Sequence, residues 1–299
     1  MPRRRISRNT AGVPTPLPTR LLLPVDARVP LRRLDGRATA GDAPWQTPYQ
    51  SRFVTLEGER ELDAWLHFCL GHHIEFLLWQ ATALAGERVI AAVRADERDE
   101  VVRWMGRVTR LVRGSGALLH YCAAFDPSAY DPCLRASMEA ERDDFSGDMS
   151  TEFLAMMAVK ADLVELLGDV GDLGRELQAF RAAERSWAVD HGEVIHALHP
   201  GKSLLREKAE RLAREADAFD YRGYVERVVR GALARSDYDD YFGVSRVDDL
   251  TLDAYWTQAV AKVALAHAHL TLRGVHRSQI MRADAALLET LSALVDRSG

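Results

Sequence analysis

Apolar residues recur at helical spacing through most of the chain, beginning near residue 59. The longest such stretch, residues 59–87, is apolar on nearly all sides, which is typical of a helix at the centre of a domain. Stripes at steps of three and four residues predict further helices at residues 97–124, 134–141, 153–167, 173–199, 203–235, 250–272 and 283–295. We expect a loop in the tyrosine-rich segment 236–246. No segment of useful length alternates as a strand does, so we predict an all-α fold.

Residues 1–50 lack this helical periodicity and carry most of the 11 prolines. Proline disfavours the helical conformation at the residue before it, so this segment is expected to be extended. We therefore divide the chain into an N-terminal arm, residues 1–50, and an all-helical catalytic domain, residues 51–299. The arm is expected to lie over the domain or over a neighbouring subunit.

Composition narrows the classes of partner. The chain is 47% hydrophobic with a net charge of -5, so a sizeable core is expected and nucleic acid is not an expected partner. Its three cysteines form no CxxC pair, which argues against a disulfide framework and fits a reducing cytoplasm. The N-terminal segment shows no apolar run of the length of a signal peptide or membrane helix, so we expect a cytoplasmic protein that does not enter membranes.

Two adjacent histidines, His72 and His73, lie in the most apolar of the predicted helices. An unpaired polar group in such a place costs about 2–7 kcal/mol. Glu75 lies three residues after His72 and is expected to accept a hydrogen bond from it. His73 shares its face with Phe76 and has no carboxylate at helical spacing, which leaves it the freer imidazole. The residues alone leave two interpretations open, hydrogen-bonded core histidines or a functional base.

A second candidate lies in the predicted helix 173–199, where Trp187, His191 and Ile195 share one face. An imidazole in an apolar stripe needs either a hydrogen-bond partner or a metal, and haem iron favours a histidine on a rigid helix. His191 is thus either a core histidine or an axial ligand. His196 is its rival as a ligand, although it points well away from that face.

Three segments of the chain resemble tryptophan 2,3-dioxygenase, an all-helical haem enzyme. The distal-histidine helix of that family reads roughly HQxxELW, and the sequence HHIEFLLW here sets His73 six residues before a tryptophan. The proximal segment of the family reads roughly WRxRHxxMV, and Trp187 and His191 take those positions. A third family segment, SGFQSxQYR, is similar to residues 145–150. The three segments occur in the same order, within residues 60–210.

The chain departs from that family at two points. The arginine that clamps the substrate carboxylate in the family would fall near Leu154, and the glycine-rich turn is shortened to residues 200–203. The chain therefore more closely resembles the haem-dependent tyrosine hydroxylases, which make 3,4-dihydroxyphenylalanine for natural products. This resemblance implies a histidine-ligated haem bundle that is a homo-oligomer. Its substrate would be L-tyrosine or a related phenolic amino acid, and its oxidant hydrogen peroxide or dioxygen, with peroxide expected.

The resemblance also implies roles for individual residues. Haem b would be bound through its iron to His191, with His196 as the alternative ligand. His73 would be the distal catalytic base, with His72 as the alternative. The residues implied to contact the cofactor are Trp187, Ile195 and Phe76, and those implied to hold the substrate are Arg135, Ser146 and Ser150. Two other functions stay open: a tryptophan or indole 2,3-dioxygenase-like enzyme, and a non-catalytic helical binding protein.

Overall fold

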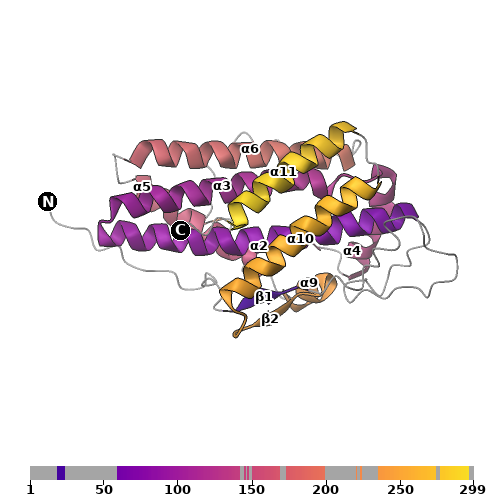
Figure 1. The fold of residues 1–299 in the computed structure, drawn as a ribbon, viewed down its shortest axis with the longest axis horizontal. Helices are drawn as coiled ribbons and strands as arrows, with labels where there is room; N and C mark the ends of the chain where they lie inside the picture. Colours follow the sequence, from indigo (N-terminus) through magenta and orange to yellow (C-terminus); the bar gives the residue numbers. More distant parts are fainter. Residues whose placement is uncertain are drawn as a thin grey trace.

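The computed structural model describes residues 19–23, 59–141, 145, 147, 150–168, 173–198, 220, 223, 235–273 and 277–295. The long helices are α2 (Glu59–Ala95), α3 (Arg98–Cys122), α5 (Thr151–Gly168), α6 (Gly174–Leu198), α10 (Leu252–Arg273) and α11 (Arg277–Val295) (Figure 1). The short elements are β1 (Arg20–Leu22), η2 (Pro127–Ala129), the π-helical turn η3 (Tyr130–Arg135), α4 (Ala136–Glu141), α9 (Arg235–Phe242) and β2 (Ser245–Val247). Within the described residues the chain is therefore almost entirely helical, as the hydrophobic pattern predicts.

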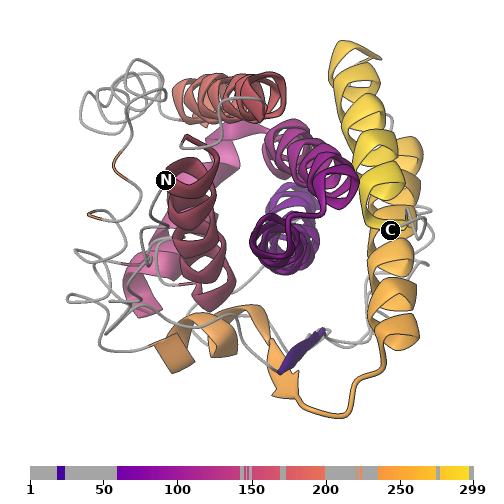
Figure 2. The ribbon, with the colours of Figure 1, turned by 90° about the vertical axis from the view of Figure 1, so that its left-hand side faces the viewer.

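Helix α2 lies at the centre of the bundle, and Figure 2 shows the other long helices around it. Helices α3 and α5 pack directly on α2, α6 packs on α3 and α5, and α10 and α11 cover another side. Trp65, Ile74 and Leu77 of α2 are fully buried. Of the described helices, α2 alone has the length and composition of a membrane span, and 72% of its most apolar window is buried inside the fold. The core of the bundle is thus built around this helix.

Glycines let α2 approach its two neighbours closely. A Cβ atom added at Gly71 would lie 2.3 Å from Sγ of Cys122 on α3, and one at Gly86 would lie 2.2 Å from Cγ1 of Val159 on α5. Because interaxial distance depends on the side chains at the contact, any larger residue at either position would push the helices apart. The two glycines therefore set how tightly the three central helices pack.

A small sheet departs from the all-α prediction. Strands β1 and β2 pair antiparallel, with Leu21 opposite Arg246, and Leu21 is fully buried. The side chain of Gln258 on α10 accepts a hydrogen bond from the Leu23 amide at 2.9 Å. The described part of the N-terminal arm thus lies against the domain. Each strand has three residues, which is too short for an alternating pattern to be recognised in the sequence.

Helix boundaries follow the prediction to within a few residues for α3, α5, α6 and α10. The predicted helix 203–235 falls almost entirely outside the described residues. The loop predicted at 236–246 is wrong, because its first part is α9 and its last part is β2. Tyr238, Tyr241 and Phe242 are spaced as i, i+3 and i+4 and are all buried, so burial of one helical face accounts for α9.

Candidate functional site

Helix α9 places an aromatic cluster against the histidines of α2. The His72 ring stacks on Phe242 with centroids 4.8 Å apart and an interplanar angle of 16°, and it lies 4.2 Å from the ring of Phe68. Phe76 meets Phe242 edge-on at 5.2 Å. Tyr238 also packs on Phe242, at 5.0 Å. The predicted cofactor contact Phe76 is therefore a buried member of this cluster.

His72 keeps one ring nitrogen available as a base. Its Nδ1–H donates to the carbonyl oxygen of Phe68 at 2.7 Å, so the lone pair of the neutral ring is on Nε2. Among the described residues the structure gives Nε2 no hydrogen-bond partner. Burial lowers the pKa of His72 to about 4, although the residue is only half-buried by surface area. The ring is therefore neutral at pH 7, with its lone pair on Nε2.

His73 is more deeply buried than its neighbour, at 1% exposure. Its Nε2 donates to the carbonyl oxygen of Phe242 at 2.8 Å, and burial holds the pKa of His73 well below its usual value. Nε2 of His73 therefore ties α2 to the C-terminal end of α9. Of the two candidate bases, His72 has the ring nitrogen that is better placed to exchange a proton.

Glu75 does not pair with His72, and the expectation that it would is wrong. Its carboxyl group instead accepts a hydrogen bond from the Ser115 hydroxyl on α3. Burial raises the pKa of Glu75 to about 8, although the Ser115 hydrogen bond opposes this rise. The group is therefore mostly protonated at neutral pH. A three-residue spacing on a helix permits the predicted contact but does not require it, and here α3 supplies a better partner.

Helix α6 carries His191, the residue that the sequence predicts as a ligand of haem iron. The His191 ring is half-buried and stacks on Trp187 at 5.1 Å with an interplanar angle of 16°. The neighbouring residue, Asp190, accepts a hydrogen bond from Nε2 of His120 on α3 at 3.0 Å. Ile195 is half-buried and His196 is exposed. The geometry therefore favours His191 over His196 as an oriented imidazole on a rigid helix.

Contacts through α3 show that His72 and His73 of α2 lie at the same level of the bundle as His191 of α6. Gly71 and Glu75 of α2 meet Cys122 and Ser115 of α3, and His120 lies between these two α3 positions in the sequence. Since His120 pairs with Asp190 of α6, the residues next to Asp190 lie at the height of His72 and His73. The histidines of α2 and His191 of α6 therefore lie at one level of the bundle, on helices that both pack on α3.

The three predicted substrate contacts have different surroundings. Arg135 pairs with Glu139 one turn later, with Nε and Oε1 2.7 Å apart. Ser150 is 1% exposed and caps α5, because its Oγ accepts the backbone N–H of Phe153 at 3.3 Å. Ser146 lies outside the described residues. The structure thus gives Arg135 and Ser150 separate local partners.

Two further groups of side chains were missed by reading the sequence. One joins Asp63 and His67 of α2 to His269 of α10, and the other contains His120, Asp190 and a nearby glutamate. A four-residue spacing between Asp63 and His67 is visible in the sequence, but nothing local connects it to His269. Both groups depend on contacts between helices that are distant in the chain.

These observations define a helical bundle in which imidazoles lie among aromatic rings on two helices. The model of one protein family, described as SfmD 3-methyl-L-tyrosine peroxygenase, matches residues 25–179, about half of the chain. The chain belongs to this family. The matched region contains α2 to α5, with His72, His73 and Arg135, and stops within α6 before His191. No curated protein matches the chain.

Family membership confirms the coarser part of the expected function, a peroxygenase-type oxidoreductase. The predicted likeness to tryptophan 2,3-dioxygenase stays a prediction. So do the division into arm and domain, the cytoplasmic location and the absence of membrane and nucleic-acid partners. Of the histidines considered as haem ligands, His191 on α6 has the more suitable surroundings, because it is half-buried and its ring stacks on Trp187. Nε2 of His73 instead bonds to a backbone carbonyl.

Proposed function

We propose that this protein is a haem-dependent hydroxylase that adds one oxygen atom to the ring of L-tyrosine, or of a ring-substituted tyrosine. The new hydroxyl would be ortho to the phenol, giving 3,4-dihydroxyphenylalanine from tyrosine, with hydrogen peroxide as the oxidant. The observation that carries the proposal is the family match over residues 25–179. We place the activity in natural-product biosynthesis, as the family resemblance implies.

In this proposal the cofactor is haem b, held by His191, with Trp187 and Ile195 beside it. Its iron would supply the redox chemistry of oxygen transfer, which side chains alone lack. The stack of His191 on Trp187 supports the assignment, because a ligand ring must keep one orientation to hold a metal. His196 is exposed, so it is kept only as the alternative ligand.

We further propose that Nε2 of His72 accepts the phenol proton of the substrate. A phenolate pushes more electron density into the ring than a phenol does, which favours substitution at the ortho carbon. Burial keeps the His72 ring neutral at pH 7, so Nε2 has a lone pair that can accept a hydrogen bond from the phenol and take its proton in the transition state. The same low pKa makes the protonated ring short-lived, so it would release the proton afterwards. His73 would act as a positioning residue, since its bond to Phe242 holds the ring that stacks on His72.

A spectrum and two pairs of variants test the assignment of the cofactor and the base. The purified protein is expected to show a haem Soret band that His191→Ala abolishes and His196→Ala retains. His72→Ala is expected to keep the band and lose turnover, whereas His73→Ala should keep part of the turnover. If His196→Ala alone lost the band, the ligand would be His196. If the wild-type protein showed no Soret band after growth with a haem precursor, the remaining interpretation would be a non-catalytic helical binding protein.

Product mass tests the substrate and the reaction. With tyrosine and hydrogen peroxide, the product is expected to gain one oxygen atom. The parallel incubation contains tryptophan and dioxygen. If tryptophan were cleaved in that incubation and tyrosine were unchanged, the protein would be assigned as a dioxygenase instead of a hydroxylase. Comparing tyrosine with 3-methyltyrosine at equal concentration decides which of the two is the better substrate.

A further inference from the structure

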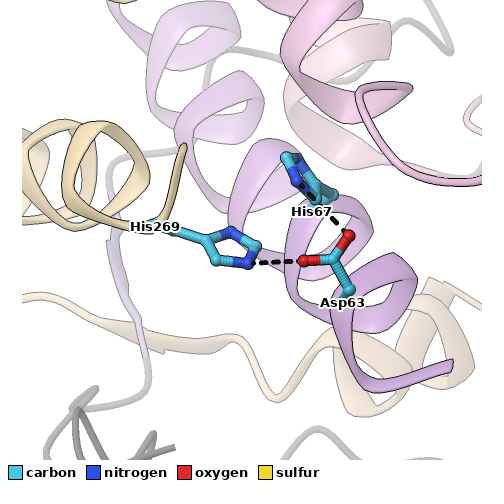
Figure 3. Close-up of side chains that lie close together, drawn as sticks. All are labelled: Asp63, His67 and His269. Atoms are coloured by element: carbon cyan, nitrogen blue, oxygen red, sulfur yellow. Dashed lines mark hydrogen bonds and ion pairs between the residues drawn. The ribbon is translucent and has the colours of Figure 1, made fainter. Parts of the chain in front are cut away.

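Asp63, His67 and His269 form a compact group between α2 and α10 (Figure 3). One ligand atom from each of the three residues lies within 4.8 Å of the other two. Nε2 of His269 is 3.0 Å from Oδ1 of Asp63, and Nε2 of His67 is 3.9 Å from Oδ2 of the same carboxylate. Two imidazole nitrogens and a carboxylate therefore converge on one point in the bundle.

Tyr121 of α3 makes a hydrogen bond to the Nδ1 atom of each of the two imidazoles. Nδ1–H of His67 donates to the backbone carbonyl oxygen of Tyr121 at 2.9 Å, and since that oxygen can only accept, the neutral ring carries its lone pair on Nε2. Nδ1 of His269 lies 3.2 Å from the Tyr121 hydroxyl. Histidines that bind metals through one nitrogen usually make such a bond through the other. The orientation of both rings is therefore set by one residue outside the group.

We propose that Asp63, His67 and His269 bind one divalent transition-metal ion of the zinc class, separate from the haem site. Two imidazoles and a carboxylate suit such an ion better than Ca²⁺ or Mg²⁺, which prefer oxygen ligands. Ligand atoms on a tetrahedral zinc ion are about 3.3 Å apart. In the structure the two nitrogens lie near different oxygens of the Asp63 carboxylate, 3.0 Å from Oδ1 for His269 and 3.9 Å from Oδ2 for His67. One ligand atom from each residue lies within 4.8 Å of the other two, so side-chain rotations would bring the three atoms to this spacing as the ion binds.

Protons balance in this binding step. The hydrogen on Nε2 of His269, which faces Asp63 in the structure, is exchanged for one on Nδ1 as the metal–nitrogen bond forms. The Tyr121 hydroxyl then accepts from Nδ1, since a hydroxyl can either donate or accept. The side chains of His67 and His269 are 0% and 1% exposed, whereas that of Asp63 is 20% exposed. Solvent therefore reaches the carboxylate side, where an ion would enter and a water would complete its coordination.

Zinc analysis of the haem-loaded full chain tests the site, because zinc is measured separately from haem iron. After treatment with a chelator and equilibrium dialysis against Zn²⁺, the wild type is expected to retain one zinc per chain. Asp63→Asn and His269→Gln, which keep the side-chain volume close to native, should weaken binding at least a hundredfold. Tyr121→Phe removes only the hydroxyl on His269 and should weaken it about tenfold to a hundredfold.

The second group of potential ligands supplies the matched control. His120, Asp190 and Glu193 also lie close together, but they are half-buried or exposed, and His120→Gln should leave zinc binding unchanged. At a hundredfold excess over Kd, zinc should raise the Tm of the wild type and of His120→Gln by about 4 °C, with no rise in Asp63→Asn. A wild type that retains no zinc would overturn the proposal. So would equal binding by Asp63→Asn, or loss of zinc in His120→Gln.

Discussion

Glu75 gives the sharpest test of the packing around α2, because its burial should make the free energy of unfolding depend on pH. Its pKa is raised from 4.5 to about 8 in the folded protein. Between these two values the folded state binds a proton that the unfolded chain releases. The contribution of Glu75 to stability is therefore greatest below about pH 4.5 and falls by up to about 1.4 kcal/mol for each pH unit up to about pH 8. The total loss is about 5 kcal/mol, of which about 3 kcal/mol is reached by pH 7.

Glu75→Gln removes this ionisation and keeps an oxygen to accept the Ser115 hydroxyl. The variant should gain stability relative to the wild type as pH rises, from almost no gain near pH 4.5 to about 4 kcal/mol at pH 8, above any offset that does not vary with pH. Urea unfolding followed by far-UV circular dichroism at several pH values measures the difference. Glu87→Gln, on the exposed side of α2, controls for loss of charge. A stability difference that stays constant between pH 5 and pH 8 would refute a buried, neutral Glu75.

Three further predictions concern contacts between helices, and urea unfolding measures each. Gly71→Ala should destabilise the fold by about 1–3 kcal/mol through its clash with Cys122, and Cys122→Ala in the same chain should restore most of the loss; no recovery would mean that the clash lies elsewhere. Glu184→Gln should cost about 3–5 kcal/mol because it leaves Lys160, 2.7 Å away, buried without its carboxylate, and Lys160→Met in addition should recover stability. Phe242→Ala should cost about 3–5 kcal/mol and reduce turnover while haem is retained; unchanged turnover would remove α9 from the site.

The aromatic cluster around His72 shows where sequence reasoning about the site stops. The pattern identified His72 and His73 as costly polar groups in an apolar helix, and burial of both rings agrees with that reasoning. It ranked His73 as the freer imidazole because only neighbours on the same helix could be considered. Nε2 of His73 bonds to the backbone carbonyl of Phe242, 169 residues away. A helical stripe reports that a side chain will be buried, but not which other segment will meet it.

The sequence by itself determined that this is a helical protein with α2 at its core, because the spacing of apolar residues is a local property that each helix carries alone. It also pointed to His191 as an imidazole on an apolar face. The short motifs in order predicted a likeness to tryptophan 2,3-dioxygenase, which stays a prediction, whereas the peroxygenase class rests on the family match. The tertiary structure alone decided which polar groups meet, as for Asp63 and His269, which lie 206 residues apart. Hydrogen bonds and metal ligands need atoms within a few ångströms, and for residues so far apart in the chain that proximity exists only once the helices have packed.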